Sequence, residues 1–124
     1  MSSVELANYI QTIRLPYNLN TLSQVAAEAA FGDREFLRDT IEKNAAERVL
    51  WEQTLDEVGG TYYKSGANFI FMSVPNAERL ADAWLAKGYQ VRRGQRDNWL
   101  RVTLPTASDG AIMRSILKDY MARQ

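Results

Sequence analysis

Arginine is the residue type in this chain that is best suited to binding chemistry, because histidine and cysteine are both absent. Arg101 lies inside an alternating run from Trp99 to Leu104, and Arg92 ends an earlier run of extended character. A planar guanidinium held on a strand binds a carboxylate or phosphate through two parallel hydrogen bonds. We therefore treat Arg101 and Arg92 as candidates for binding an anion.

Arg101 also has a purely structural interpretation. Alternation along the strand puts Leu100, Val102 and Leu104 on one face, and it puts Arg101 on the other face with Trp99 and Thr103. Antiparallel sheets commonly expose one face to water, so the residue pattern alone favours a solvent-facing arginine. Arg93 and Arg96 add positive charge nearby. A local anion site therefore stays open as the second interpretation.

The composition excludes several kinds of chemistry. Without histidine and cysteine, the usual general base, nucleophilic triads and zinc sites are missing. The carboxylates lie mainly on expected helix faces, as Glu42, Glu47 and Glu52 do, which favours solvated surface charge over a catalytic pair. No glycine-rich phosphate loop is visible. We predict no catalytic residue and no metal ligand in this chain.

Charge and hydropathy indicate the surroundings of the protein. The chain has 124 residues, and its 15 basic and 15 acidic side chains cancel, so a nucleic-acid partner is not expected. No apolar run approaches the roughly 18 residues of a membrane span, so no membrane partner is expected either. The absence of cysteine is compatible with a reducing compartment. We predict a soluble, cytoplasmic protein.

The two arginines need a sheet to position them, and the sequence predicts one after Gly60. Residues 61–63, 67–74, 89–92 and 99–104 are rich in β-branched and aromatic types, and we expect the last two runs to pair as antiparallel neighbours. Helices are predicted at 3–13, 22–31, 34–58 and 75–87, with a last helix capped by Ser108 or Asp109. The fold class is α+β: a two-layer sandwich with a small, mostly antiparallel sheet covered by helices, preceded by a helical segment and one long helix at about 34–58.

The long helix at 34–58 carries more apolar surface than a small domain needs. One stripe at helical spacing consists of Leu37, Ile41, Trp51, Leu55 and Val58. Arg48 lies within that stripe, where its stem must pack and its head must reach a carbonyl, a carboxylate or water. Phe36 and Leu50 point away from the stripe and suggest a second buried surface. We therefore expect missing sequence or a homo-oligomer.

A turn separates the first two helices. Pro16 fixes its own φ and excludes Leu15 from the helical region, so the first helix must end before it. Asn18, Asn20 and Thr21 are capping types, and one of them should cap the next helix. The run from Arg14 to Gln24 therefore has the character of a hinge.

These motifs together resemble the carboxy-terminal third of a fold-type I, pyridoxal-phosphate-dependent aminotransferase of the histidinol-phosphate aminotransferase branch of class I/II. The matching motifs are Arg14-Leu-Pro-Tyr-Asn-Leu-Asn20, Glu47-Arg48, Ser65-Gly-Ala-Asn-Phe-Ile70, and Val91-Arg92 followed by Trp99-Leu-Arg-Val-Thr103. The resemblance implies an enzyme of histidine, and so amino-acid, biosynthesis. It implies that Arg101 binds the anionic group of the substrate and that Arg92 assists with its phosphate. It also makes Arg14, Pro16, Tyr17 and Asn18 an interdomain hinge.

The resemblance divides the chain into a hinge segment, 1–31, and the aminotransferase small domain, 32–124. In the family, the lysine that forms the Schiff base and the other cofactor-binding residues lie in a larger domain that precedes the hinge. The implied partners are that missing large domain and a small phosphorylated or carboxylate substrate. We predict that this chain alone is inactive and holds no pyridoxal phosphate.

Two alternatives stay open. The chain could be a stand-alone, non-catalytic α+β module for ligand binding or interaction, which the reading frame upstream of Met1 would reveal. Within the enzyme class, a relative similar to phosphothreonine decarboxylases is compatible with this third of the sequence.

Overall fold

A computed structural model describes residues 2–14, 19–94 and 96–124. Its contacts separate two compact units, Met1–Leu37 and Arg38–Gln124. The first contains helices α1 (Val4–Thr12) and α2 (Thr21–Gly32) and the start of α3 (Arg34–Val58). The second contains the rest of α3, a sheet and two more helices. The division predicted at residues 31 and 32 refers to domains of the whole enzyme and stays a prediction.

The helices of the first unit begin at side-chain caps. The Ser3 hydroxyl accepts from the Leu6 N–H at 3.2 Å, and the Asn20 side chain accepts from the Ser23 N–H at 2.9 Å. Asn20 is therefore the cap among the predicted candidates. Neither α1 nor α2 buries any residue in the described structure.

The sheet has four strands, all antiparallel, in the order β1-β2-β4-β3. Their bounds are Thr61–Tyr63 for β1, Phe69–Ser73 for β2, Arg92–Arg93 for β3 and Trp99–Thr103 for β4. The predicted pairing of the last two strands is confirmed, but the predicted strand at 89–92 is in fact the shorter β3. The reason is that the Tyr89 N–H donates to the Trp84 carbonyl at 2.9 Å, which ties this residue to the end of a helix.

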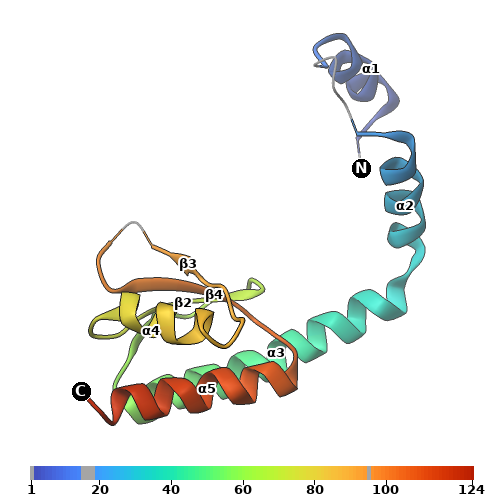
Figure 1. Ribbon diagram of the computed structural model, residues 1–124. Helices are drawn as coiled ribbons and strands as arrows, with labels where there is room; N and C mark the ends of the chain where they lie inside the picture. The colour runs from blue at the N-terminus through green and yellow to red at the C-terminus, as the bar shows by residue number, and fades with distance from the viewer. Residues whose placement is uncertain (1, 15–18, 95) are drawn as a thin grey trace. The chain divides into compact units, whose positions relative to one another are not determined.

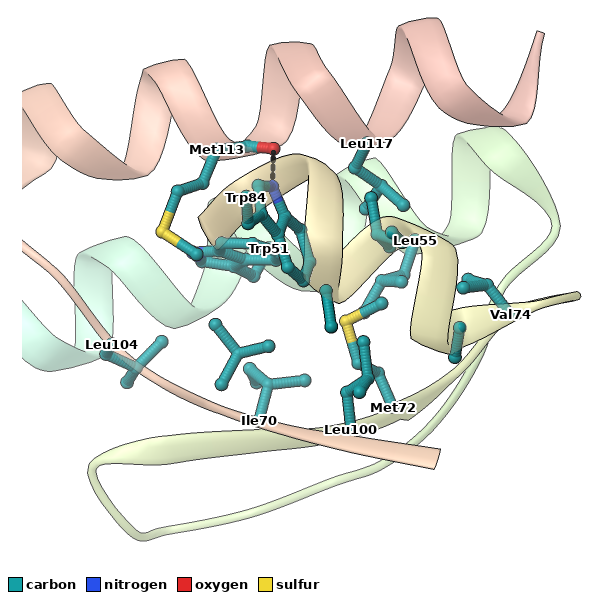
Figure 2. Close-up of a cluster of buried hydrophobic side chains, with 14 residues drawn as sticks. Trp51, Leu55, Ile70, Met72, Val74, Trp84, Leu100, Leu104, Met113 and Leu117 are labelled. Atoms are coloured by element: carbon teal, nitrogen blue, oxygen red, sulfur yellow. Dashed lines mark hydrogen bonds between the residues drawn. The ribbon is translucent and has the colours of Figure 1, made fainter. Parts of the chain in front are cut away.

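The part of α3 that belongs to the second unit, together with α4 (Ala77–Leu85) and α5 (Ala107–Met121), lies on one side of the sheet (Figure 1). Between them lies one apolar core, in which Trp51 and Trp84 meet edge to face with ring centroids 5.9 Å apart. Figure 2 shows this core with the Trp84 indole donating to the Met113 carbonyl at 3.0 Å. The predicted α+β class, with a small antiparallel sheet covered by helices, is confirmed.

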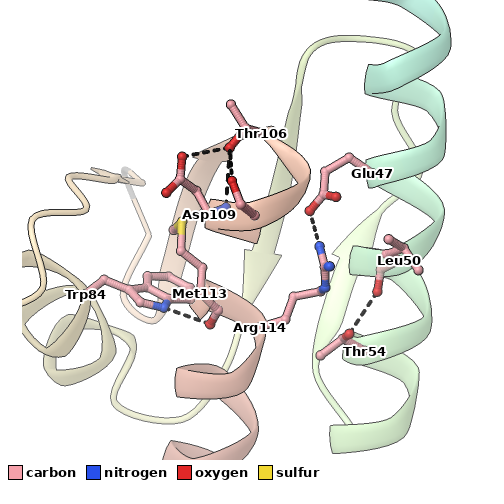
Figure 3. A network of polar contacts seen from close by, with 9 residues as sticks. Glu47, Leu50, Thr54, Trp84, Thr106, Asp109, Met113 and Arg114 are labelled. Atoms are coloured by element: carbon pink, nitrogen blue, oxygen red, sulfur yellow. Dashed lines mark hydrogen bonds and ion pairs between the residues drawn. The ribbon is translucent and has the colours of Figure 1, made fainter. Parts of the chain in front are cut away.

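The last helix begins differently from the prediction. Its cap is Thr106, not Ser108 or Asp109, and the helix starts at Ala107. The Thr106 hydroxyl accepts from the Asp109 N–H at 3.3 Å and donates to the Asp109 carboxylate at 2.8 Å (Figure 3). Thr106 and Asp109 thus form a reciprocal pair of hydrogen bonds three residues apart, as in a capping box, and this pair favours Thr106 as the cap.

Glu47 is buried, although its position predicted an exposed helix face. Only 4% of it is accessible, and its carboxylate pairs with Arg114 of α5 (Figure 3). Space for the carboxylate comes from Gly110, where a Cβ would lie 1.8 Å from a Glu47 oxygen. The prediction failed because both partners lie more than sixty positions away along the chain.

The apolar stripe of α3 is buried in its second half alone. Trp51 and Leu55 have no accessible surface, whereas Leu37 and Ile41 are half exposed. Phe36 and Leu50 are exposed too, so the described residues do not cover the predicted second surface. Arg48 behaves as its position predicted, since its guanidinium donates to the Ala67 carbonyl.

Candidate anion-binding site

The face of the sheet opposite the helices carries the predicted arginine, Arg101. It lies in the middle of β4, between the buried Leu100 and Val102, and strand alternation therefore turns it to the open face. Its Nε is buried and has no hydrogen-bond partner within the described structure. A buried donor without a partner carries a desolvation cost that a bound acceptor would remove.

Arg92 lies directly opposite Arg101 across the β3–β4 pair. Directly opposed residues of antiparallel strands project to the same face, with Cβ atoms roughly 5 Å apart. The structure therefore brings together the two arginines that the sequence singled out. It places Arg92 on the edge strand, where its side chain is exposed, and Arg101 one strand further in, where it is half-buried.

An open groove of about 520 Å³ runs over this part of the sheet. We call it the arginine groove, and its lining consists of Tyr63, Phe71, Arg92, Arg93, Gly94, Arg96, Trp99 and Arg101. No carboxylate belongs to this lining. The groove is therefore strongly positive, although the chain as a whole is neutral.

Arg93 differs from its neighbour, although it is next to it in the chain. It lies opposite Leu100, whose side chain faces the helices, and it reaches two carboxylates of α4. Its guanidinium is 3.1 Å from Asp82 and 3.6 Å from Glu78. Its charge is thus balanced, while the described residues place no carboxylate within ion-pair distance of Arg92 or Arg101.

Packing limits the directions in which Arg101 is able to bind. Its guanidinium carbon lies 5.3 Å from the centre of the Phe69 ring, on the neighbouring strand. A guanidinium that covers an aromatic face keeps its N–H groups at its edge, in its own plane. Planar, edge-on donation suits the two oxygens of a carboxylate or phosphate.

Among the described residues the pKa is shifted at Tyr62 of β1 and at Tyr89, and both lie outside the groove lining. Partial burial raises the pKa of Tyr89, and its hydrogen bond to Asp109 at 3.2 Å acts in the same direction. This contact joins the segment before β3 to the start of α5. Tyr89 therefore helps to hold the edge strand that carries Arg92.

Sequence reasoning placed Trp99 on the same strand face as Arg101, but it missed the cluster that Trp99 forms with Tyr63 and Phe71. Tyr63, Phe71 and Trp99 stack on one another with their rings inclined by 12° to 27°. It also missed Gly94, where a Cβ would come within 2.9 Å of the Trp99 Cβ. Strand alternation could have placed Phe71 on the open face as well, but the contact between the Phe71 and Trp99 rings depends on which strands pair.

The predicted hinge residues are described in part. Arg14 follows α1 and donates to the Gln11 side chain. Pro16, Tyr17 and Asn18 lie outside the described residues. The hinge therefore stays a prediction.

The fold and the motifs now define a class of protein. Residues 1–116 match the model of the family described as aminotransferase class I and II. The chain belongs to this family, whose cofactor is pyridoxal phosphate.

Curated relatives indicate the branch of the family to which the chain is similar. The chain is 48% identical over 121 residues to the histidinol-phosphate aminotransferase of Limosilactobacillus fermentum, which covers 98% of this chain and 34% of that protein. The resemblance to this branch, inferred from the motifs, is confirmed. The chain spans about a third of the length of the curated relatives it matches.

Solved structures support the fold. The histidinol-phosphate aminotransferase of Clostridium acetobutylicum superimposes with a TM-score of 0.80 and 22% identity, over 97% of this chain and 39% of the other. The enzyme of Sinorhizobium meliloti, solved in complex with pyridoxal-5'-phosphate, gives a TM-score of 0.79 and 17% identity over 96% and 35%. At these identities the likeness concerns the fold.

The groove does not by itself fit the cofactor of the family. A pyridoxal phosphate enzyme needs a lysine for the Schiff base and an acidic partner for the ring nitrogen. None of the four lysines lines the groove, and Lys43 and Lys118 are paired with Asp39 and Glu57. Across the described ranges, no cluster of potential metal ligands occurs, and no helix has the length and apolar character to cross a membrane.

Proposed function

We propose that this chain is the small domain of a histidinol-phosphate aminotransferase-like enzyme, and that Arg101 and Arg92 bind the anionic group of its substrate. The observation that carries the proposal is the pairing of these two arginines, opposite each other on the uncovered face of the sheet. The 48% identity to a histidinol-phosphate aminotransferase supports the branch. Amino-group transfer belongs to the whole enzyme.

The two arginines have different roles in binding the anion because they differ in burial. Arg101 is held by its neighbours on β4 and by Phe69, and it presents a fixed planar edge to the anion. Arg92, on the exposed edge strand, adds a second charge from the side. Together they neutralise a doubly charged phosphate better than a single guanidinium could, because each forms charge-assisted hydrogen bonds.

The test is phosphate binding by the chain itself. Inorganic phosphate is titrated at constant ionic strength, and binding is followed by NMR shifts of the arginine side chains. We expect Arg101→Gln to weaken binding by about tenfold or more, because one charge-assisted hydrogen bond contributes roughly 1.5–3 kcal/mol.

Arg79→Gln is the matched control, because Arg79 is an exposed arginine of α4 outside the groove lining. It should bind phosphate as the wild type does. Equal phosphate affinity in the wild type and in Arg101→Gln would refute the role assigned to Arg101. Arg92→Gln should give a smaller loss, since its side chain is more exposed.

We also infer that the chain alone does not catalyse transamination and does not hold pyridoxal phosphate. The absence of a lysine from the groove supports this inference. Mixing the purified chain with pyridoxal phosphate should produce no new visible absorbance band, and histidinol phosphate should not be converted. A stable band that survives dialysis would contradict it.

A large domain is the partner that we propose for the exposed apolar side chains of the amino-terminal half. They include Val4, Ile10, Leu22, Val25, Phe31, Leu37 and Ile41. Large apolar side chains exposed in such number on successive helices indicate a surface that another protein segment covers. We therefore expect the chain to self-associate when its partner is absent, and light scattering that finds a strict monomer would count against this expectation.

A further inference from the structure

The arginine groove has an aromatic wall beside its charged one. Tyr63 of β1, Phe71 of β2 and Trp99 of β4 form one stacked cluster, which we call the aromatic trio. The Trp99 ring centre lies 4.7 Å from that of Phe71 and 5.1 Å from that of Tyr63. Phe71 lies directly opposite Arg101 on the paired strand. Ring and guanidinium are therefore immediate neighbours.

The aromatic trio lies outside the core. The core fills the other face of the sheet, where Trp51 and Trp84 have no accessible surface. Tyr63, by contrast, is 56% exposed, and all three rings line the groove. Three aromatic rings left at a surface cost hydration free energy that a bound apolar group would recover.

The charges next to the aromatic trio have one sign. Arg93 is engaged with α4, which leaves Arg92, Arg96 and Arg101 as the cations that face the groove without a carboxylate in its lining. The groove thus offers two adjoining surfaces, one that stacks and one that binds anions. A ligand that uses both must carry its negative charge on a planar ring or close to one.

We propose that the aromatic trio is a ring-binding subsite, so that the arginine groove prefers an anion attached to a planar ring over the same anion alone. This inference rests on the proposed function, because it takes the arginine pair as the anion site. It adds Trp99, Phe71 and Tyr63 as residues that determine specificity. The ring stacks on them while the phosphate or carboxylate meets Arg101 and Arg92.

The experiment compares three probes on the 124-residue chain: inorganic phosphate, phenyl phosphate and cyclohexyl phosphate. The last two differ in the planarity of the ring and little in size. Binding is read from the indole N–H signal of Trp99, which is distinguishable because Trp51 and Trp84 are buried in the core. We expect phenyl phosphate to bind about three- to tenfold more tightly than cyclohexyl phosphate, the range that aromatic stacking supplies.

Two variants assign the difference to the aromatic trio. Trp99→Leu has no indole reporter at this position, so its binding is followed by the NMR signals of the arginine side chains. It should lose the advantage of phenyl phosphate over cyclohexyl phosphate while still binding inorganic phosphate. Should Trp99→Leu fail to fold, Tyr63→Leu at the exposed rim serves instead and should reduce the advantage. Circular dichroism confirms that each variant is folded before titration.

The outcomes separate this inference from the proposed function. Phosphate binding that depends on Arg101, with no gain for phenyl phosphate over inorganic phosphate, overturns the ring subsite alone. Equal affinity for phenyl and cyclohexyl phosphate also overturns it, because stacking would then contribute nothing. Phosphate binding that does not depend on Arg101 overturns the proposed function instead.

Discussion

The two faces of the β2–β4 pair show how one strand pattern supplies both stability and chemistry. On the covered face, Ile70, Met72, Leu100 and Val102 are all buried against helices. On the open face, the same two strands present aromatic rings and Arg101. Because successive side chains alternate, neither set could change faces without a shift in register that would move both. The covered face therefore holds the open face in place, and substitutions should separate the two roles.

The largest effect is expected on the covered face, at Trp84. Trp84→Ala removes a fully buried ring, its edge-to-face contact with Trp51 and its hydrogen bond to the Met113 carbonyl. We expect a loss of about 3–5 kcal/mol in the free energy of unfolding, because the site cannot collapse around the cavity. Urea denaturation followed by circular dichroism measures it.

Leu85→Ala is the control for this prediction, because Leu85 is the next residue of α4 and is 58% exposed. Its cost should stay within about 0.5 kcal/mol, as for most surface positions. If both variants lost the same stability, the core would not lie where the structure places it.

An effect of intermediate size is expected at Gly94, which directly follows β3 and its two arginines. A Cβ there would lie 2.9 Å from the Trp99 Cβ and 3.0 Å from the Trp99 carbonyl oxygen, so backbone must shift. We expect Gly94→Ala to cost about 1–3 kcal/mol, as overpacking does. It should also weaken phosphate binding, because β3 carries Arg92.

Gly66→Ala provides the comparison, since a Cβ at Gly66 meets nothing within 4 Å. It should leave both the unfolding free energy and the phosphate affinity unchanged. If Gly94→Ala kept the unfolding free energy and the phosphate affinity of the wild type, the connection between β3 and β4 would tolerate the added methyl group. Gly94 would then have no role in placing Arg92.

The sequence was sufficient to predict that these segments are strands and which of their residues face the core, because both depend on local periodicity. It was also sufficient to place Arg101 on the open face. It was not sufficient for the contacts between strands: the aromatic trio needs β1 beside β2 and β2 beside β4, an order that no local pattern specifies. The buried Glu47 was missed for the same reason, since its environment is formed by a distant helix.

The smallest effect is expected at Arg93, the arginine that turns toward the covered face. Arg93→Ala removes its contacts with Asp82 and Glu78, but all three side chains are more than half exposed. Exposed ion pairs contribute about 0.2–1 kcal/mol, and salt screens them, so we expect a loss in that range that shrinks in 1 M salt. In an Asp82→Asn, Glu78→Gln background the same substitution should cost almost nothing, which a double-mutant cycle in urea measures. Phosphate affinity should fall by less than about threefold, in contrast to Arg101→Gln, because the charge of Arg93 is already balanced. A loss of phosphate affinity as large as that of Arg101→Gln would mean that Arg93 binds the anion itself, and the two faces would then share one function.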